Sequence, residues 1–154
     1  MLLSKSCIYG MRAALYLASS SNNKYISIKQ ISNDLDISPH FLTKILQELT
    51  RVDLLESQKG PTGGVRLKRA GDEVTLVEIV AAIDGMDLLT ECALGLPGCG
   101  TAKPCPLHEQ WADTRDEIKK MLQDTTLSDL VRKGKEGNLR ITADGSFDWL
   151  PKEN

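Results

Sequence analysis

Three of the four cysteines of this chain and one of its two histidines fall within the stretch CALGLPGCGTAKPCPLH, residues 92–108. Their spacing is C-x6-C-x5-C-x2-H, with Cys92, Cys99, Cys105 and His108 as candidate donors. Thiolates are soft ligands that suit zinc and iron–sulfur clusters, and the intervening Gly and Pro residues give a loop able to wrap a polynuclear centre. The paired C-x2-C knuckles typical of zinc sites are absent. The spacing therefore favours a cluster, with zinc and a thiol–disulfide switch as the alternatives.

The three cysteines leave one position of a cluster to another residue. We expect His108 to fill it, because its spacing from Cys105 is local and a ring nitrogen there can reach the same metal as a neighbouring thiolate. Cys7 is the alternative fourth ligand, although a small helix residue of this kind also has a simple structural role in a core. A histidine ligand would make cluster stability depend on pH, which a fourth thiolate would largely remove.

The segment SPHFLTKILQELTRV, residues 38–52, predicts a helix with one apolar and one polar face. Ser38 is a good N-cap, and Pro39 suits the first helical position. The polar face carries His40, Thr43, Lys44, Gln47 and Arg51. Two helices are expected before it, one from Ser4 to about residue 19 and a short one at residues 27–36. Such a polar face fits either a solvated surface or a contact with a polar partner.

A candidate hairpin follows this helix, with strands near residues 55–58 and 65–67 around a turn rich in Gly and Pro. Four basic residues decorate it, namely Lys59, Arg66, Lys68 and Arg69. Three helices followed by a basic hairpin predict a winged helix-turn-helix, with the third helix in a major groove of DNA and the hairpin along the backbone or in the minor groove. The turn is not a Walker-type phosphate loop, because GPTGGVRL lacks the Lys-Ser/Thr ending.

The second half predicts a helix at residues 76–83, the cysteine loop, and a long helix over about 106–125. Apolar positions of the long helix are spaced 4, 3, 4, 3, 4, at Leu107, Trp111, Thr114, Ile118, Met121 and Thr125. This heptad seam has charged outer faces, Arg115 among them, so we expect the helix to pair with a second copy; packing within its own domain is the alternative. Residues 126–133 predict a closing helix, and residues 134–154 a flexible tail or small hairpin.

The whole chain of 154 residues, with 41% hydrophobic and 26% charged residues, has an ordinary globular composition. We expect a mainly α fold with a small β-hairpin wing, divided into residues 1–75 (winged helix-turn-helix DNA-binding domain), 76–133 (cluster loop and dimerisation helices) and 134–154. The net charge of −2 is unevenly placed, since residues 1–75 hold ten Lys and Arg against seven Asp and Glu. No apolar run is long enough for a membrane span or signal core, so a cytoplasmic protein without membrane contact is expected. With no catalytic constellation in the sequence, we do not expect an enzyme.

The order of these segments resembles the IscR/NsrR/CymR-like family of winged helix-turn-helix transcriptional regulators, and IscR most of all. The resemblance covers residues 1 to about 131. It rests on SKSCIYGMRAALYLA, the KGPTGG wing, TLVEIVAAIDG, the three spaced cysteines and TLSDL. It implies a homodimer that binds double-stranded promoter DNA and whose affinity is controlled by an iron–sulfur cluster sensing cluster supply, redox state or nitric oxide. The alternative is a cluster-free member that acts through a thiol switch or a partner protein.

Residue roles follow from the same resemblance. It implies DNA contacts from the recognition helix by Ser38, Pro39, His40, Phe41 and Lys44, and from the wing by Lys59, Gly60, Pro61, Thr62 and Gly63. The cluster ligands it implies are Cys92, Cys99 and Cys105, with a [2Fe-2S] cluster expected and a [4Fe-4S] cluster as the alternative. In the resembled dimers helix one approaches the partner's cluster, which is how Cys7 would act as a ligand in trans.

Overall fold

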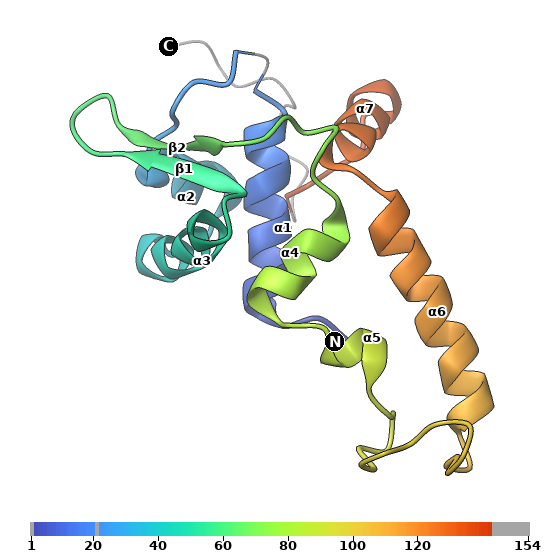
Figure 1. The fold of residues 1–154 in the computed structure, drawn as a ribbon. Helices are drawn as coiled ribbons and strands as arrows, with labels where there is room; N and C mark the ends of the chain where they lie inside the picture. The colour runs from blue at the N-terminus through green and yellow to red at the C-terminus, as the bar shows by residue number, and fades with distance from the viewer. Residues whose placement is uncertain (1, 21, 143–154) are drawn as a thin grey trace.

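The structure, a computed structural model, describes residues 2–20 and 22–142. Its elements in chain order are α1 (Lys5–Ala18), α2 (Ile28–Leu35), α3 (Pro39–Arg51), β1 (Leu55–Gln58), β2 (Gly64–Leu67), α4 (Leu76–Ile83), α5 (Asp87–Thr90), α6 (His108–Asp124) and α7 (Leu127–Gly137). The first three helices, the hairpin, α4 and α7 form a head, and α5, the cysteine loop and α6 form an arm that projects from it (Figure 1). The expectation of a mainly helical fold with a hairpin wing is confirmed.

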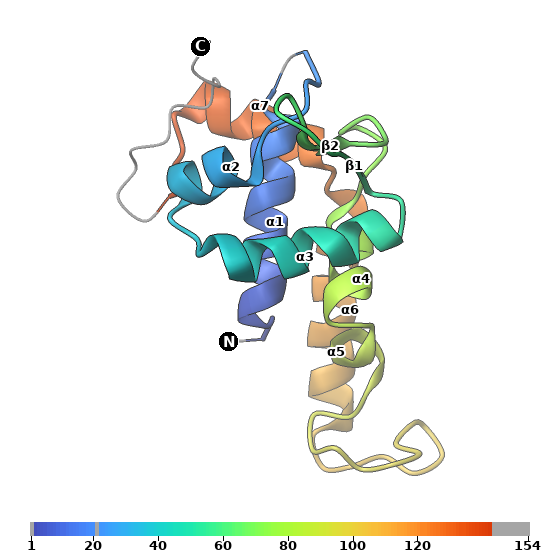
Figure 2. The ribbon, with the colours of Figure 1, turned by 90° about the vertical axis from the view of Figure 1, so that its left-hand side faces the viewer.

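The first three helices of the head begin at residues suited to helix starts. The Ser4 hydroxyl accepts the Cys7 N–H at 3.0 Å at the start of α1, and Ser27 accepts the Gln30 N–H at 3.1 Å at the start of α2. Pro39 occupies the first turn of α3 as predicted, but the Ser38 side chain makes no capping hydrogen bond. The helix α3 crosses in front of α1 when the molecule is viewed from the side of the wing (Figure 2).

Apolar burial holds the head together. Fully buried side chains come from every layer of it, including Tyr16, Ile31, Leu35, Leu42, Leu46, Leu49, Leu55, Ile79 and Leu127. Gly10 of α1 leaves room for the end of α4, since a Cβ at this position would lie 2.4 Å from Ile83 Cδ1. The helix α4 is thereby packed against α1 and also contacts α3.

The wing is a two-stranded antiparallel hairpin in which Leu55 pairs with Leu67 and Gln58 with Gly64. A further bridge joins the wing to the segment before α2, because Ile26 and Val65 exchange backbone hydrogen bonds of 2.9 Å each. Gly64 makes that approach possible: its φ is +149°, and a Cβ there would lie 2.1 Å from the Ile26 carbonyl oxygen. The wing is thus fixed to the body of the head at its base.

The second half differs from the prediction in one additional helix and in two boundaries. The one-turn helix α5 was not expected, because four residues carry too little periodicity to show a pattern. The long helix begins at His108 rather than near residue 106, since Cys105, Pro106 and Leu107 form the turn that precedes it. The closing helix runs to Gly137, past the predicted end at 133, and stops at Asn138 in the left-handed region.

The C-terminal end of the described chain returns to the head. Arg12 of α1 donates to the Ile141 carbonyl at 3.1 Å and to the Leu35 carbonyl at the end of α2 at 3.0 Å. The rest of the predicted tail, residues 143–154, lies outside the described residues. Among the helices that are described, none combines the length and the apolar character that crossing a bilayer requires.

Candidate functional site

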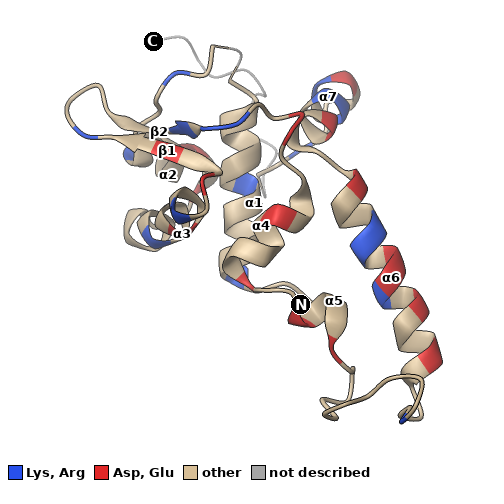
Figure 3. Ribbon diagram, viewed as in Figure 1, with Lys and Arg blue, Asp and Glu red and all other residues tan. Residues whose placement is uncertain are grey.

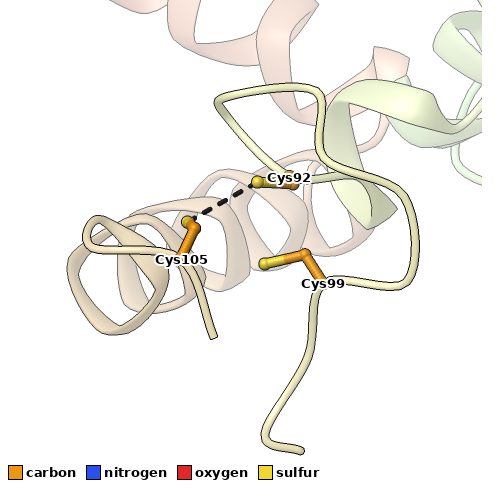
Figure 4. A group of neighbouring side chains, drawn as sticks. All are labelled: Cys92, Cys99 and Cys105. Carbon is orange, nitrogen blue, oxygen red and sulfur yellow. Dashed lines mark hydrogen bonds between the residues drawn. The ribbon is translucent and has the colours of Figure 1, made fainter. Parts of the chain in front are cut away.

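The cysteine loop brings the sulfur atoms of Cys92, Cys99 and Cys105 together at the tip of the arm. The three Sγ atoms all lie within 4.8 Å of one another, and those of Cys92 and Cys105 are 3.6 Å apart. Figure 4 shows the three side chains converging from the start of the loop after α5, the middle of the loop and the turn before α6. The predicted thiolate group is therefore assembled within one chain, although its first and last members are thirteen positions apart in the sequence.

Local backbone groups favour the thiolate form of one of these cysteines. The N–H groups of Leu96 and Leu94 donate to the sulfur of Cys92, and the Cys105 and Cys99 thiols lie beside it, which lowers its pKa to about 7 despite some desolvation. A thiol with such a pKa is substantially ionised at neutral pH, and the thiolate is the form that binds metals and attacks disulfides. The donor set therefore fits a thiophilic metal centre and equally a redox-active thiol pair.

The two candidates for a fourth ligand lie in different surroundings. His108, the first residue of α6, places its Nδ1 3.5 Å from the Sγ of Cys99. Cys7 is fully buried in the core of the head, where desolvation and the nearby charge of Asp84 raise its pKa to about 12. The structure therefore brings His108 to the loop cysteines and leaves Cys7 in the hydrophobic core.

The predicted seam of α6 divides into two faces. Trp111 and Ile118 are half-buried within the same chain, where α6 packs on α4 and α5, and Leu122, which the heptad did not include, is buried with them. Leu107, Thr114 and Met121 are exposed, with 57% of Met121 accessible. These three positions are seven residues apart, so the chain leaves one heptad stripe of α6 uncovered.

One α6 residue was placed on the wrong face by the sequence pattern. Arg115 was expected on the charged outer surface, but its side chain is only 20% exposed. Its guanidinium reaches the backbone carbonyls of Thr90 and Glu91. Trp111 and Arg115 are four residues apart and share a helix face, but the backbone carbonyls that they contact leave no signal in the sequence.

The recognition-helix candidates lie together at the start of α3. Ser38, Pro39, His40 and Lys44 are exposed there. Phe41 is half-buried, with its ring set edge-on to Tyr9 at 5.6 Å between centroids. The Thr43 hydroxyl donates to the Pro39 carbonyl at 2.7 Å, and Arg51 is paired with Glu48 at 3.0 Å. The exposed polar side chains of this face therefore include His40 and Lys44 in its first two turns and Gln47 in its third.

At the wing tip, Lys59, Gly60, Pro61 and Thr62 are exposed, and Gly63 is half-exposed. The Gly63 N–H closes the turn onto the Gly60 carbonyl at 3.0 Å. The other basic residues of the hairpin are paired, Arg66 with Glu56 at 2.6 Å, Lys68 with Asp53 at 2.8 Å and Arg69 with Glu78 at 2.6 Å. Of the hairpin cations that were expected to meet a polyanion, Lys59 at the tip is the one for which the described residues provide no salt bridge.

Charge is distributed differently over the two parts of the molecule (Figure 3). Basic residues mark the wing and α3, with an acidic residue on β1, whereas acidic residues recur along the length of α6 and outnumber the basic ones there. Exposed acids on α6 include Glu109, Asp113, Asp116, Glu117 and Asp124. The face formed by α3 and the wing is thus the better suited to a polyanion, and the arm is not.

Comparisons with known proteins agree with this architecture. The family model Rrf2, described as an iron-dependent transcriptional regulator, matches residues 3–133. "Protein aau3" of Rhizobium meliloti (strain 1021) is 34% identical over 133 residues, which is 86% of each chain. The structure of CymR, the global cysteine regulator of B. subtilis, has 28% identity and a TM-score of 0.71, and the match covers 83% of this chain and 94% of CymR. T. potens IscR, at 21% identity and a TM-score of 0.72 over 89% of this chain and 90% of its own, shares the fold.

Proposed function

Because the chain belongs to the Rrf2 family of iron-dependent transcriptional regulators, we propose that it is a homodimer whose affinity for promoter DNA is controlled by an iron–sulfur cluster held in its cysteine loop. Members of this family are transcriptional regulators and not enzymes, as the sequence predicted. The observation that carries the proposal is the approach of three Sγ atoms to within 4.8 Å of one another. When bound, the cluster would supply a redox-active centre that also reacts with nitric oxide.

The proposed ligands are Cys92, Cys99, Cys105 and His108. Their donors fall into two pairs, Cys92 with Cys105 at 3.6 Å and Cys99 with His108 at 3.5 Å. Two donors on one tetrahedral metal with bonds of about 2.3 Å lie about 3.8 Å apart. Each pair has the spacing of donors to one metal; we propose a [2Fe-2S] cluster here, with a [4Fe-4S] cluster as the alternative. The buried, protonated state of Cys7 supports His108 as the fourth ligand.

Iron and sulfide content of protein purified without oxygen tests this function. We expect about two irons and two sulfides per chain, with visible absorption, in the wild type. Cys99→Ser and His108→Ala should lose or alter the cluster, whereas the matched Cys7→Ser variant should keep it. An unaltered electron paramagnetic resonance spectrum in His108→Ala together with a changed one in Cys7→Ser would transfer the fourth position to Cys7 and place the centre between two subunits.

The proposed DNA interface consists of the start of α3 and the wing tip. Two identical α3 helices related by a twofold axis predict an operator that is a partial inverted repeat, with half-sites about one or more helical turns apart. Lys44→Ala should weaken binding by roughly 1–3 kcal/mol on the operator and less on random DNA if its ammonium contacts a base. Lys133→Ala, an exposed cation on α7, is the matched control. Equal losses on both DNAs would reassign Lys44 to phosphate.

The proposed dimer contact uses the uncovered stripe of α6. Met121, 57% exposed, is the better probe of this contact, because Ile118 also packs inside the chain. Met121→Asp should yield a monomer with reduced operator affinity, since burying an unpaired charge typically costs several kcal/mol. A dimer of normal affinity would show that the contact lies elsewhere.

A thiol switch is the second candidate, and two observations favour it. The Cys92 and Cys105 sulfurs are 3.6 Å apart, and the pKa of Cys92 is lowered to about 7. Oxidation would join them in a disulfide as two electrons and two protons pass to an oxidant such as oxidised glutathione. Operator binding by iron-free protein, measured reduced and oxidised, separates the candidates: an effect of oxidation without metal supports the switch, and an effect of cluster loading alone supports the cluster.

A further inference from the structure

Two side chains of α6 hydrogen-bond to the backbone immediately before Cys92. The Trp111 indole N–H donates to the Glu91 carbonyl at 2.9 Å. The Arg115 guanidinium donates to the Thr90 carbonyl at 3.1 Å and to the Glu91 carbonyl at 3.4 Å. These carbonyls end the single turn of α5, where a helix leaves its last acceptors without partners in the helix itself. The residue that follows them is Cys92.

The other proposed ligands depend on α6 in a different way. His108 is the first residue of the helix, and its N–H donates to the Cys105 carbonyl at 3.0 Å. Cys105 and His108 are therefore placed by the start of α6 itself. Cys92 is not close to α6 in sequence, because the loop of residues 92–105 lies between them. This loop is loosely packed, since a Cβ added to Gly95 or Gly98 would meet nothing within 4 Å. The position of Cys92 relative to Cys105 depends on the contacts made just before it.

The burial of Arg115 argues that its carbonyl contacts matter. Its side chain is 20% exposed, and its Nε is buried without a hydrogen-bond partner in the described residues. The nearest acid, Asp116, lies 3.9 Å from that Nε, which is too far for a hydrogen bond. An apolar side chain could fill this place without an unsatisfied N–H group, so the guanidinium is explained by the two carbonyls it reaches.

We propose that Trp111 and Arg115 are positioning residues, which fasten the Thr90–Glu91 backbone to α6 and thereby set the Cys92 sulfur against Cys105. This inference rests on the proposed thiolate centre. Residues that orient metal ligands typically change metal affinity about 10–100-fold when they are replaced. The helix α6 then places three of the four donors. Its first turn places Cys105 and His108, and the side chains of Trp111 and Arg115 place Cys92.

Cobalt(II) titration of the reduced, metal-free full-length chain tests the proposal, because thiolate-to-cobalt absorption reports both affinity and thiolate number. Trp111→Phe keeps the ring and removes the N–H, and Arg115→Met keeps the stem and removes the donors. Each should raise the cobalt dissociation constant about tenfold or more with altered bands. Arg115→Lys should restore part of the affinity. Lys120→Met, which removes a 79% exposed cation from the same helix, is the matched control and should bind as the wild type does.

A metal-independent measurement completes the test. In a Cys99→Ser background, the equilibrium of the Cys92–Cys105 disulfide with reduced and oxidised glutathione reports how closely the two thiols are held. Trp111→Phe and Arg115→Met should shift this equilibrium toward the dithiol. Folded variants with unchanged cobalt affinity and unchanged disulfide equilibrium would overturn the positioning role. If the wild type binds no cobalt through thiolates, the proposed metal function fails, and the disulfide equilibrium still decides whether these residues position Cys92.

Discussion

The head and the arm of this molecule are stabilised by different means. In the head, Leu42, Leu46 and Leu49 of α3 are at most 1% exposed. Helix caps, the β-bridge at the base of the wing and helix packing hold the same elements in place. In the cysteine loop, residues 93–98 are all exposed, including Leu94 at 55% and Leu96 at 49%. Apolar burial therefore fixes the proposed DNA-binding surface, whereas the proposed positioning of Cys92 relies on a few hydrogen bonds from α6.

This contrast fits a division of labour. A surface that has to match DNA gains from rigidity, and a sensing centre gains from a segment that responds to a ligand at little cost in stability. The two regions are joined where α4 packs on both α1 and α3 and where α6 packs on α4. Packing thus runs without a break from α6 through α4 to α3, the proposed recognition helix.

The largest expected difference between the regions is in the effect of truncating a leucine. Leu42→Ala, at a site with 0% exposure, should lower the free energy of unfolding by about 2–5 kcal/mol through lost burial and a cavity. Leu96→Ala in the loop should change it by less than about 0.5 kcal/mol. Urea unfolding of the metal-free protein measures both. A comparable loss at both sites would show that the loop belongs to the cooperative core.

A glycine pair sharpens the comparison at the backbone level. Gly64→Ala would place a Cβ 2.1 Å from the Ile26 carbonyl at a φ of +149°, so we expect a loss of about 2 kcal/mol or more and weaker operator binding. At Gly100 in the loop a Cβ meets nothing within 4 Å, and Gly100→Ala should be close to neutral. Thermal melting and a DNA-binding assay distinguish the two; a neutral Gly64→Ala would mean that the wing base can move.

The buried thiol of the head should make stability depend on pH. Burial, reinforced by the charge of Asp84, raises the pKa of Cys7 from 9.0 to about 12. Between these values the unfolded chain releases a proton that the folded chain keeps, so stability present below pH 9 falls as pH rises, by at most about 1.4 kcal/mol per unit. The free energy of unfolding, measured at several pH values from 8 to 11, should fall more steeply with pH for the wild type than for Cys7→Ala. Parallel curves would contradict the buried thiol.

The smallest effect on stability is expected from modifying the arm. Cys92, with a pKa of about 7, should be alkylated by iodoacetamide at pH 7.5 well before Cys7, and the modified metal-free protein should unfold within about 0.5 kcal/mol of the unmodified one. Peptide mass spectrometry gives the order of modification. Prior reaction at Cys7 would show that the head opens more readily than the loop.

Much of the molecule follows from the sequence because its signals are local. The capping role of Ser4, Pro39 in the first turn of α3 and the turn residues of the wing act within a few positions, so the helices and the hairpin were predicted closely. The cysteine spacing named the three thiols that the structure brings within 4.8 Å of one another. All three thiols lie in one short loop, so their grouping could be predicted from spacing alone, although the contacts from α6 to the backbone before Cys92 could not.

Contacts between distant segments were decided only by the tertiary structure. The heptad pattern could not tell which stripe of α6 its own chain covers, because burial depends on where α4 and α5 lie, and α5 left no periodic signal. The basic residues of the hairpin could not be separated into paired and unpaired from sequence, since their acids come from β1, the α3–β1 turn and α4. Arg115 was misplaced for the same reason: its partners, the carbonyls of residues 90 and 91, are backbone atoms about 25 residues away, and a backbone acceptor has no signature in the sequence.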